Sequence, residues 1–195
     1  MNTFIKSLIL AVAAFAVANL NGCSFVPVTA DMQYTPMAHA QHVQNAGTVT
    51  VRVTGGQEDR IIGYKKGGLG QRLASVKTSK PIKDVFATAV NKELISSGFN
   101  TSVDSPTVIA VDLSKYMEDT EVGFFAADYV SAADATISVI KNGMPIYSKK
   151  IEGSGKVTSV LISADAIVDS LNKATADALN QLFSDPNFIA AISNK

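Results

Sequence analysis

The sequence contains one cysteine, two histidines and no tryptophan, and its 17 basic residues are balanced by 17 acidic ones. A single cysteine cannot form an internal disulfide, and with two histidines it cannot supply a structural zinc site of the usual ligand spacing. Because the formal net charge is zero, no excess of positive charge is present to neutralise phosphates, which argues against a nucleic-acid partner. The hydrophobic fraction of 47% is too high for a disordered chain, and 195 residues suit one ordinary domain.

The amino terminus has the pattern of a secretory signal. Lys6 precedes an apolar run over Leu8–Leu20, and a zone of small and polar residues follows at Asn19–Gly22. The run is shorter than the roughly 20 residues that span a bilayer core, whereas a basic start, an apolar stretch of this length and a small-residue cleavage zone are typical of export signals. A buried first helix is the alternative. The sequence therefore predicts that residues 1–22 are a lipoprotein signal peptide that is removed.

Residues 20–23, Leu-Asn-Gly-Cys, resemble a bacterial lipobox, whose usual form is leucine, a small residue, glycine or alanine, and cysteine. Asn21 departs from the commonest residue at its position, and a free or buried thiol is the alternative. The resemblance implies that Cys23 receives a diacylglycerol thioether, becomes the first residue of the mature protein and is then acylated on its amine. Two or three acyl chains bind a membrane firmly, because each buried methylene contributes about 0.8 kcal/mol.

The residue after the cysteine bears on the destination of the protein. An aspartate at this place favours retention in the inner membrane of many Gram-negative bacteria, and the chain has Ser24 instead. By this rule the resemblance implies an anchor in the outer membrane that faces the periplasm. We expect a short lipidated tether over residues 23–26 and a periplasmic domain over residues 27–195, and no second long apolar run follows in the sequence.

Hydrophobic periodicity divides this domain into strands and helices. Alternation with a period of two predicts strands at residues 27–35, 48–54, 99–103, 107–116, 132–141 and 144–152. Apolar residues at spacings of three and four predict a helix that is capped by Ser79 and stops at Gly98, and a second long helix that is capped by Ser163. A short last helix follows Asp185-Pro186. This order predicts a single α+β domain, a mainly antiparallel sheet with two principal helices packed on one face.

Three polar segments are expected to be connections. Residues 55–79 contain six glycines among basic residues, with at most a brief strand near 73–77, and their length marks a candidate functional loop. Residues 118–121 predict an acidic solvated turn, and residues 154–159 predict a polar connector. By contrast, Asn142-Gly143 between two alternating runs predicts a type I′ hairpin, because both central residues of that turn need positive φ.

The sequence offers no complete set of catalytic or ligating residues. The glycine-rich stretch 63–73 lacks the Gly-Lys-Ser/Thr ending of a phosphate-binding loop and the third glycine of a dinucleotide fingerprint. His39 and His42 have no carboxylate or cysteine near enough in sequence to complete a metal site. Ser154 lies in only a fragment of a Gly-x-Ser-x-Gly motif. We therefore expect no enzyme activity, no cofactor and no metal, with an envelope hydrolase that uses Ser154 or His42 as an alternative.

Two groups of side chains are candidates for a contact surface. The basic residues of the glycine-rich stretch would suit an anionic partner, such as a lipid headgroup or an acidic protein face, although a solvated loop is the simpler interpretation; they are Arg60, Lys65, Lys66 and Arg72. Adjacent aromatics at Phe124 and Phe125 cannot both point to one face of a strand. One of them is therefore expected to be exposed as a contact residue, and burial of both at a bend is the alternative.

The arrangement of these elements resembles the YajG-type family of bacterial outer-membrane lipoproteins. The resemblance rests on the lipobox, the Val-x-Val strand that leads to Arg60-Ile61-Ile62-Gly63, the helix end at 94–99, the strand at 108–113, the Asn142-Gly143 hairpin and the terminal helix with Asp185. It implies an envelope lipoprotein with no catalytic residues to transfer. We expect protein contacts within an envelope assembly, with a partner that the sequence does not identify. The alternative is an auxiliary lipoprotein subunit of a lipid-trafficking ABC transport system, in which a similar order of elements occurs.

Overall fold

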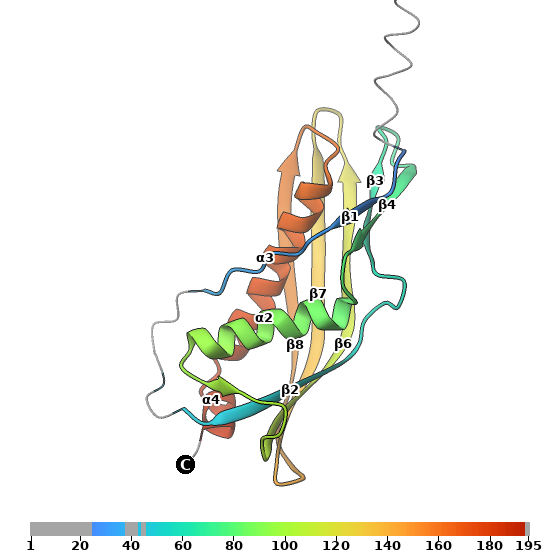
Figure 1. Ribbon diagram of the computed structural model, residues 1–195. Coiled ribbons are helices and arrows are strands. Elements are labelled where there is room, and N and C mark those ends of the chain that lie inside the picture. Colours follow the sequence, from blue (N-terminus) through green and yellow to red (C-terminus); the bar gives the residue numbers. More distant parts are fainter. Residues whose placement is uncertain (1–24, 38–42, 44–45, 194–195) are drawn as a thin grey trace, which may run out of the picture.

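Two mixed β-sheets and three helices form the part of the chain that the computed structural model describes, residues 25–37, 43 and 46–193 (Figure 1). The strands are β1 (Val28–Ala30), β2 (Thr48–Gly55), β3 (Ile61–Lys66), β4 (Arg72–Thr78), β5 (Asn100–Thr101), β6 (Thr107–Val122), β7 (Ala127–Lys141) and β8 (Met144–Ser159). The helices are α2 (Ile82–Ser96), α3 (Ala164–Phe183) and α4 (Pro186–Ile192). The α+β class is confirmed, and the two principal helices α2 and α3 lie on one face of the larger sheet (Figure 1).

The larger sheet has the strand order β5-β2-β6-β7-β8 and curls around α3 as a half-barrel (Figure 1). Strands β6, β7 and β8 form an antiparallel meander, but β2 runs parallel to both β5 and β6. The prediction of a mainly antiparallel sheet is therefore corrected to a mixed one. The reason is the long connection between β2 and β6, which contains α2 and returns the chain to the starting end of the sheet, as a parallel pair requires.

Strand β6 is longer than predicted because a β-bulge shifts its alternation. Before the bulge the odd-numbered residues are buried, whereas after it the buried side chains are Tyr116, Glu118 and Thr120. The pairing with β7 slips by one residue between Leu113 and Lys115, which leaves an extra residue on β6. Residues 118–121 thus belong to a strand and not to the predicted turn. The alternation of buried and exposed residues shifts at the bulge, so the sequence pattern does not continue into the second half of the strand.

The glycine-rich stretch forms a second, smaller sheet instead of the predicted loop. Strands β3 and β4 pair as an antiparallel hairpin, and β1 joins β4 in parallel. Two irregularities in the β3–β4 register, at Ile61/Gly63 and at Lys65/Lys66, interrupt the alternation that would have identified β3 in the sequence. The brief strand expected near 73–77 is confirmed as part of β4.

Helix α3 lies in close contact with β8 because two inward-facing positions of that strand are glycines. A Cβ atom at Gly153 would lie 2.1 Å from the carbonyl oxygen of Ala174, and one at Gly155 would lie 2.0 Å from that of Ser170. Both distances are far shorter than a van der Waals contact. The segment predicted as a polar connector is therefore the second half of β8, whose inward side carries glycine where other strands carry apolar residues.

Of the two serines that were predicted to cap the long helices, one is confirmed and one is wrong. Ser163 caps α3 as predicted, its side chain accepting from the N–H of Asp165, and Asp185 caps α4. The predicted cap Ser79 is wrong, because α2 begins one residue after Pro81 and Ser79 instead donates a hydrogen bond to Asp31. The type I′ hairpin is confirmed by positive φ at Asn142 (52°) and Gly143 (80°).

We expect the substitutions Gly153→Ala and Gly155→Ala each to destabilise the domain by about 1–3 kcal/mol or more, the range for over-packing a tight core. The reason is that the added methyl group meets helix backbone, which cannot move aside as a flexible side chain would. Urea unfolding followed by circular dichroism measures the change.

Gly68→Ala is the matched control, since a Cβ atom at Gly68 has open space around it. An equal loss of stability in all three variants would contradict the close-packing explanation.

Candidate functional site

One end of the molecule gathers three turns and the start of the described chain (Figure 1). The hydroxyl group of Tyr129 donates to the carbonyl oxygen of Leu161 and accepts from the N–H of Ser163, which places the β8–α3 connection over the start of β7. Lys66, the last residue of β3, donates from Nζ to the carbonyl oxygen of Thr120 near the end of β6. The β3–β4, β6–β7 and β8–α3 connections therefore lie at the same end of the sheets.

The amino-terminal segment begins at this same end. Strand β1 runs parallel to β4 with Val28 opposite Val76, so the residues before Val28 lie beside the start of β4. Lys65 Nζ lies 3.5 Å from the carbonyl oxygen of Val26, which it contacts as a hydrogen-bond donor. The chain thus enters the domain at the end where the three turns meet.

Large apolar side chains are exposed at this end. Phe124 and Phe125 are 94% and 85% exposed and pack edge-to-face with ring centroids 4.7 Å apart. The others are Phe25, Val26, Leu69, Val160, Leu161 and Ile162. These eight residues, called the apolar tip below, make up eight of the twelve large hydrophobic side chains that are exposed in the described part of the chain.

The sequence predicted that one of the two aromatic residues at 124–125 is exposed. In the structure both are exposed, because both rings project from the tight turn between β6 and β7. The turn is closed by a hydrogen bond from the N–H of Gly123 to the carbonyl oxygen of Ala126. Sequence reasoning did not identify the remaining members of the apolar tip. The signal that was available is the run Val160-Leu161-Ile162, three apolar residues in a connection between two serines.

The four basic candidate residues do not form one cluster. Lys65 is buried and reaches towards Val26, whereas Lys66 pairs with Asp119 at 2.5 Å. Arg72 is exposed and lies over the ring of Tyr64, 4.3 Å from its centroid. Arg60 lies at the other end of the hairpin, directly before β3 and six residues before Lys66, which pairs with Arg72. Its guanidinium donates to the carbonyl oxygen of Ser79. Only Arg60 and Arg72 present an exposed cation for a partner.

A buried carboxyl group lies behind the apolar tip. Glu118 Oε1 accepts a hydrogen bond from Thr120 Oγ1 at 2.6 Å, and Oε2 has no hydrogen-bond partner among the described residues. Burial raises the pKa of Glu118 from an ordinary value of 4.5 to about 7, against the opposing effects of the Thr120 hydrogen bond and the charge of Lys66. The glycine at position 63 makes room for this group, since a Cβ there would lie 2.5 Å from Oε2.

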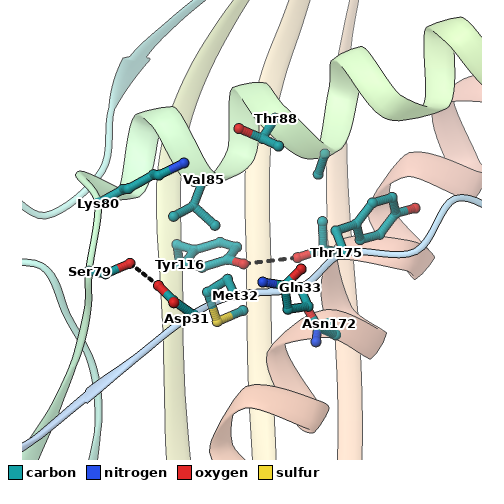
Figure 2. Close-up of a pocket in the computed structure, with 12 residues that line it drawn as sticks. Asp31, Met32, Gln33, Ser79, Lys80, Val85, Thr88, Tyr116, Asn172 and Thr175 are labelled. Atoms are coloured by element: carbon teal, nitrogen blue, oxygen red, sulfur yellow. Dashed lines mark hydrogen bonds between the residues drawn. The ribbon is translucent and has the colours of Figure 1, made fainter.

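A crevice of about 160 Å³ lies between the segment 31–34, helix α2 and helix α3 (Figure 2). Tyr116 from β6 lines it and shares a hydrogen bond of 3.2 Å with Thr175. Burial raises the pKa of the Tyr116 hydroxyl from its ordinary value of 10 to about 12. The crevice is thus a small space beside the amino-terminal segment that is lined by both polar and apolar side chains.

The other chemical candidates have ordinary structural contacts or lie outside the described residues. Ser154 lies on β8, where its N–H donates to Asp177 Oδ2 at 2.9 Å. His39, His42 and Cys23 lie outside the described residues. Within the described ranges, no three side chains of histidine, cysteine, aspartate or glutamate come together as a metal site would require. None of the helices in those ranges is long and apolar enough to cross a membrane.

Comparison with known proteins gives one family and several similar folds. Residues 35–193 match the family described as "Uncharacterized lipoprotein". Protein XCC0632 from Xanthomonas campestris, of family DUF330, has a crystal structure that aligns with a TM-score of 0.58 at 13% identity, over 83% of this chain and 96% of that one. A second crystal structure, of an uncharacterized protein, aligns with a TM-score of 0.50 at 11% identity, over 82% of this chain and 98% of the other. At these identities the two structures establish a shared fold. A comparison with curated protein sequences found no match.

The raised pKa of Glu118 predicts a pH-dependent stability. Between pH 4.5 and 7 the folded protein holds a proton that the unfolded chain releases, so the free energy of unfolding falls as the pH rises through this range. Glu118→Gln, which stays neutral, should remove that fall and gain stability over the natural protein above pH 7. Urea unfolding at a series of pH values measures the effect.

The matched control is Glu121→Gln, which alters an exposed carboxylate in the same strand. This variant should keep the fall in stability. If the free energy of unfolding of Glu118→Gln fell with pH as much as that of the natural protein, the raised pKa of Glu118 would not be its cause.

Proposed function

Because the chain belongs to the YajG family of lipoproteins, whose model covers residues 35–193, we propose that it is anchored in the outer membrane through lipidated Cys23. In this proposal the domain faces the periplasm. It has no catalytic role and acts through protein contacts in an envelope assembly.

The observation that carries the proposal is the position of the lipobox relative to the folded domain. Cys23 precedes Phe25, the first described residue, by two positions, and Phe25 lies at the apolar tip. Two residues span at most about 7 Å. An acyl group on Cys23 therefore holds this end of the domain at the membrane surface, and the opposite end, with the β7–β8 hairpin, extends into the periplasm.

The outer-membrane and periplasmic location rests on Ser24. This residue replaces the aspartate that favours inner-membrane retention in many Gram-negative bacteria, so export continues to the outer membrane. The two or three acyl chains of a processed lipoprotein supply firm anchoring without a membrane-spanning helix.

Contact with another protein is proposed because the described residues contain exposed groups for recognition and no assembled catalytic set. Arg60 and Arg72 project from the two ends of the β3–β4 hairpin. Fixed guanidinium groups suit carboxylate groups on a partner, which they bind in a bidentate manner. We therefore place the protein-binding surface on this hairpin.

The anchor is tested by the variant Cys23→Ala. We expect it to lose acyl labelling and to leave the outer-membrane fraction, because the thioether cannot form. Metabolic labelling with a fatty acid and density-gradient separation of the two membranes measure both properties.

The control for the localisation rule is Ser24→Asp, which keeps the cysteine and should move the labelled protein towards the inner membrane. Normal acyl labelling of the Cys23→Ala variant would contradict the proposed anchor.

The partner surface is tested by placing a photo-crosslinking amino acid at position 60 or 72 in cells. We expect crosslinks to one periplasmic or outer-membrane protein, lost when Cys23→Ala is combined with the probe. Mass spectrometry of the products identifies the partner.

A probe at Lys115, which is exposed elsewhere on β6, is the matched control. Crosslinks to a subunit of an inner-membrane lipid-transport complex would favour the alternative function as an auxiliary subunit. Probes at 60 and 72 that capture no protein would contradict a contact role for the hairpin.

A further inference from the structure

We propose that the apolar tip inserts into the headgroup region of the bilayer that carries the anchor, so that the protein is held by two membrane contacts. This inference rests on the proposed lipidation of Cys23. It assigns Phe124 and Phe125 to lipid contact, together with the turn of the β3–β4 hairpin, and leaves the protein partner to the opposite end of that hairpin, where Arg60 lies.

The first observation is the absence of charge from the tip. Four segments build it, residues 25–30, 67–71, 122–127 and 157–164, and none of them contains aspartate, glutamate, lysine or arginine. In a chain with 34 charged side chains, four converging segments without charge form a distinct surface. Charged groups are the ones that cost most to bring into a membrane.

The second observation is that several backbone groups of these turns are already hydrogen-bonded. Gly67 and Gly70 close the β3–β4 turn, through Gly67 N–H to the Gln71 carbonyl at 2.9 Å and Gly70 N–H to the Gly67 carbonyl at 2.8 Å. The N–H of Leu161 donates to Ser159 Oγ at 3.1 Å, and its carbonyl oxygen accepts from Tyr129. Satisfied polar groups lower the cost of leaving water, so these turns suit partial immersion.

The third observation is that two ion pairs lie directly behind the tip. Lys66 pairs with Asp119 at 2.5 Å, and Lys156 pairs with Asp128 at 2.7 Å. These residues follow the apolar side chains along the strands towards the middle of the molecule. A hydrophobic end bordered by charge matches the layering of an interfacial membrane contact, in which apolar side chains enter by roughly 5–10 Å and charged ones stay at the surface.

The short backbone between Cys23 and Phe25 indicates that a lipid bilayer, and not a protein, covers the apolar tip. An acyl chain on Cys23 and the side chain of Phe25 are separated by at most about 7 Å of backbone. A folded protein cannot fit between the membrane and the tip within that length. The bilayer is therefore the surface that covers Phe124, Phe125 and Leu161.

The test uses the full-length lipidated protein in vesicles of phosphatidylethanolamine and phosphatidylglycerol. Its only natural cysteine is Cys23, the proposed site of lipidation, so Phe125→Cys introduces a single free thiol for an environment-sensitive fluorophore. We expect a blue shift of its emission, quenching by lipids that carry a nitroxide near the headgroup, and loss of quenching by aqueous iodide. A label that stays fully open to iodide in vesicle-bound protein would overturn the proposal.

The matched control is Val103→Cys, which labels an exposed apolar position outside the tip. This label should remain accessible to iodide. Equal protection at both positions would indicate general burial in the vesicle preparation and would also overturn a specific role for the tip.

A second arrangement separates this inference from the anchor. The variant Cys23→Ser with Phe125→Cys, carrying an amino-terminal histidine tag directly before residue 23, is bound to vesicles that contain a nickel-chelating lipid. Insertion of the label into the bilayer under these conditions supports membrane insertion of the apolar tip, even if mass spectrometry finds no acyl group on Cys23 of the natural protein. An aqueous label here, or in-cell crosslinks from position 125 to a protein and not to lipid, would overturn the inference.

Discussion

The architecture depends on the close approach of α3 to β8, which Gly153 and Gly155 permit. With the helix axis brought so near, its side chains reach the outer edge of the sheet. Asp177 accepts from the N–H of Ser154, and Gln181 donates to the carbonyl oxygen of Glu152. Helix α3 thereby covers backbone groups of an edge strand that would otherwise be free to pair with another chain.

The same contact sets the geometry of the apolar tip. Strand β8 and helix α3 run in opposite directions, so the connection between them, with Val160–Ile162, must lie at the end of the sheet where β7 begins. Tyr129 then fixes this connection beside the β6–β7 turn through two hydrogen bonds. A surface made from separate turns is thus held as one rigid end by the packing of the core.

The amino-terminal segment links that end to the rest of the domain. After β1 it crosses the molecule, and the hydroxyl group of Tyr34 donates to the buried carboxyl group of Glu93 on α2, which also accepts from the N–H of Met37 at 2.9 Å. The amino-terminal segment is therefore held to both α2 and β4. In the proposed function, this arrangement fixes the orientation of the domain relative to the membrane.

Local patterns in the sequence determined the α+β class, the two long helices, the Asn142-Gly143 hairpin and the cap at Ser163, because each depends on residues that are neighbours in the chain. The signal and the lipobox are also local patterns, and they stay predictions because they lie outside the described residues. Tertiary structure decided the parallel pairing of β2 with β6, the strand at 118–122 beyond the bulge, and the second half of β8, where inward-facing positions are glycines. It also separated the four basic candidates and assembled the apolar tip, which no single segment encodes. These features depend on contacts between residues far apart in the sequence, where a bulge or a glycine changes the local pattern and its meaning is visible only in the packing partner.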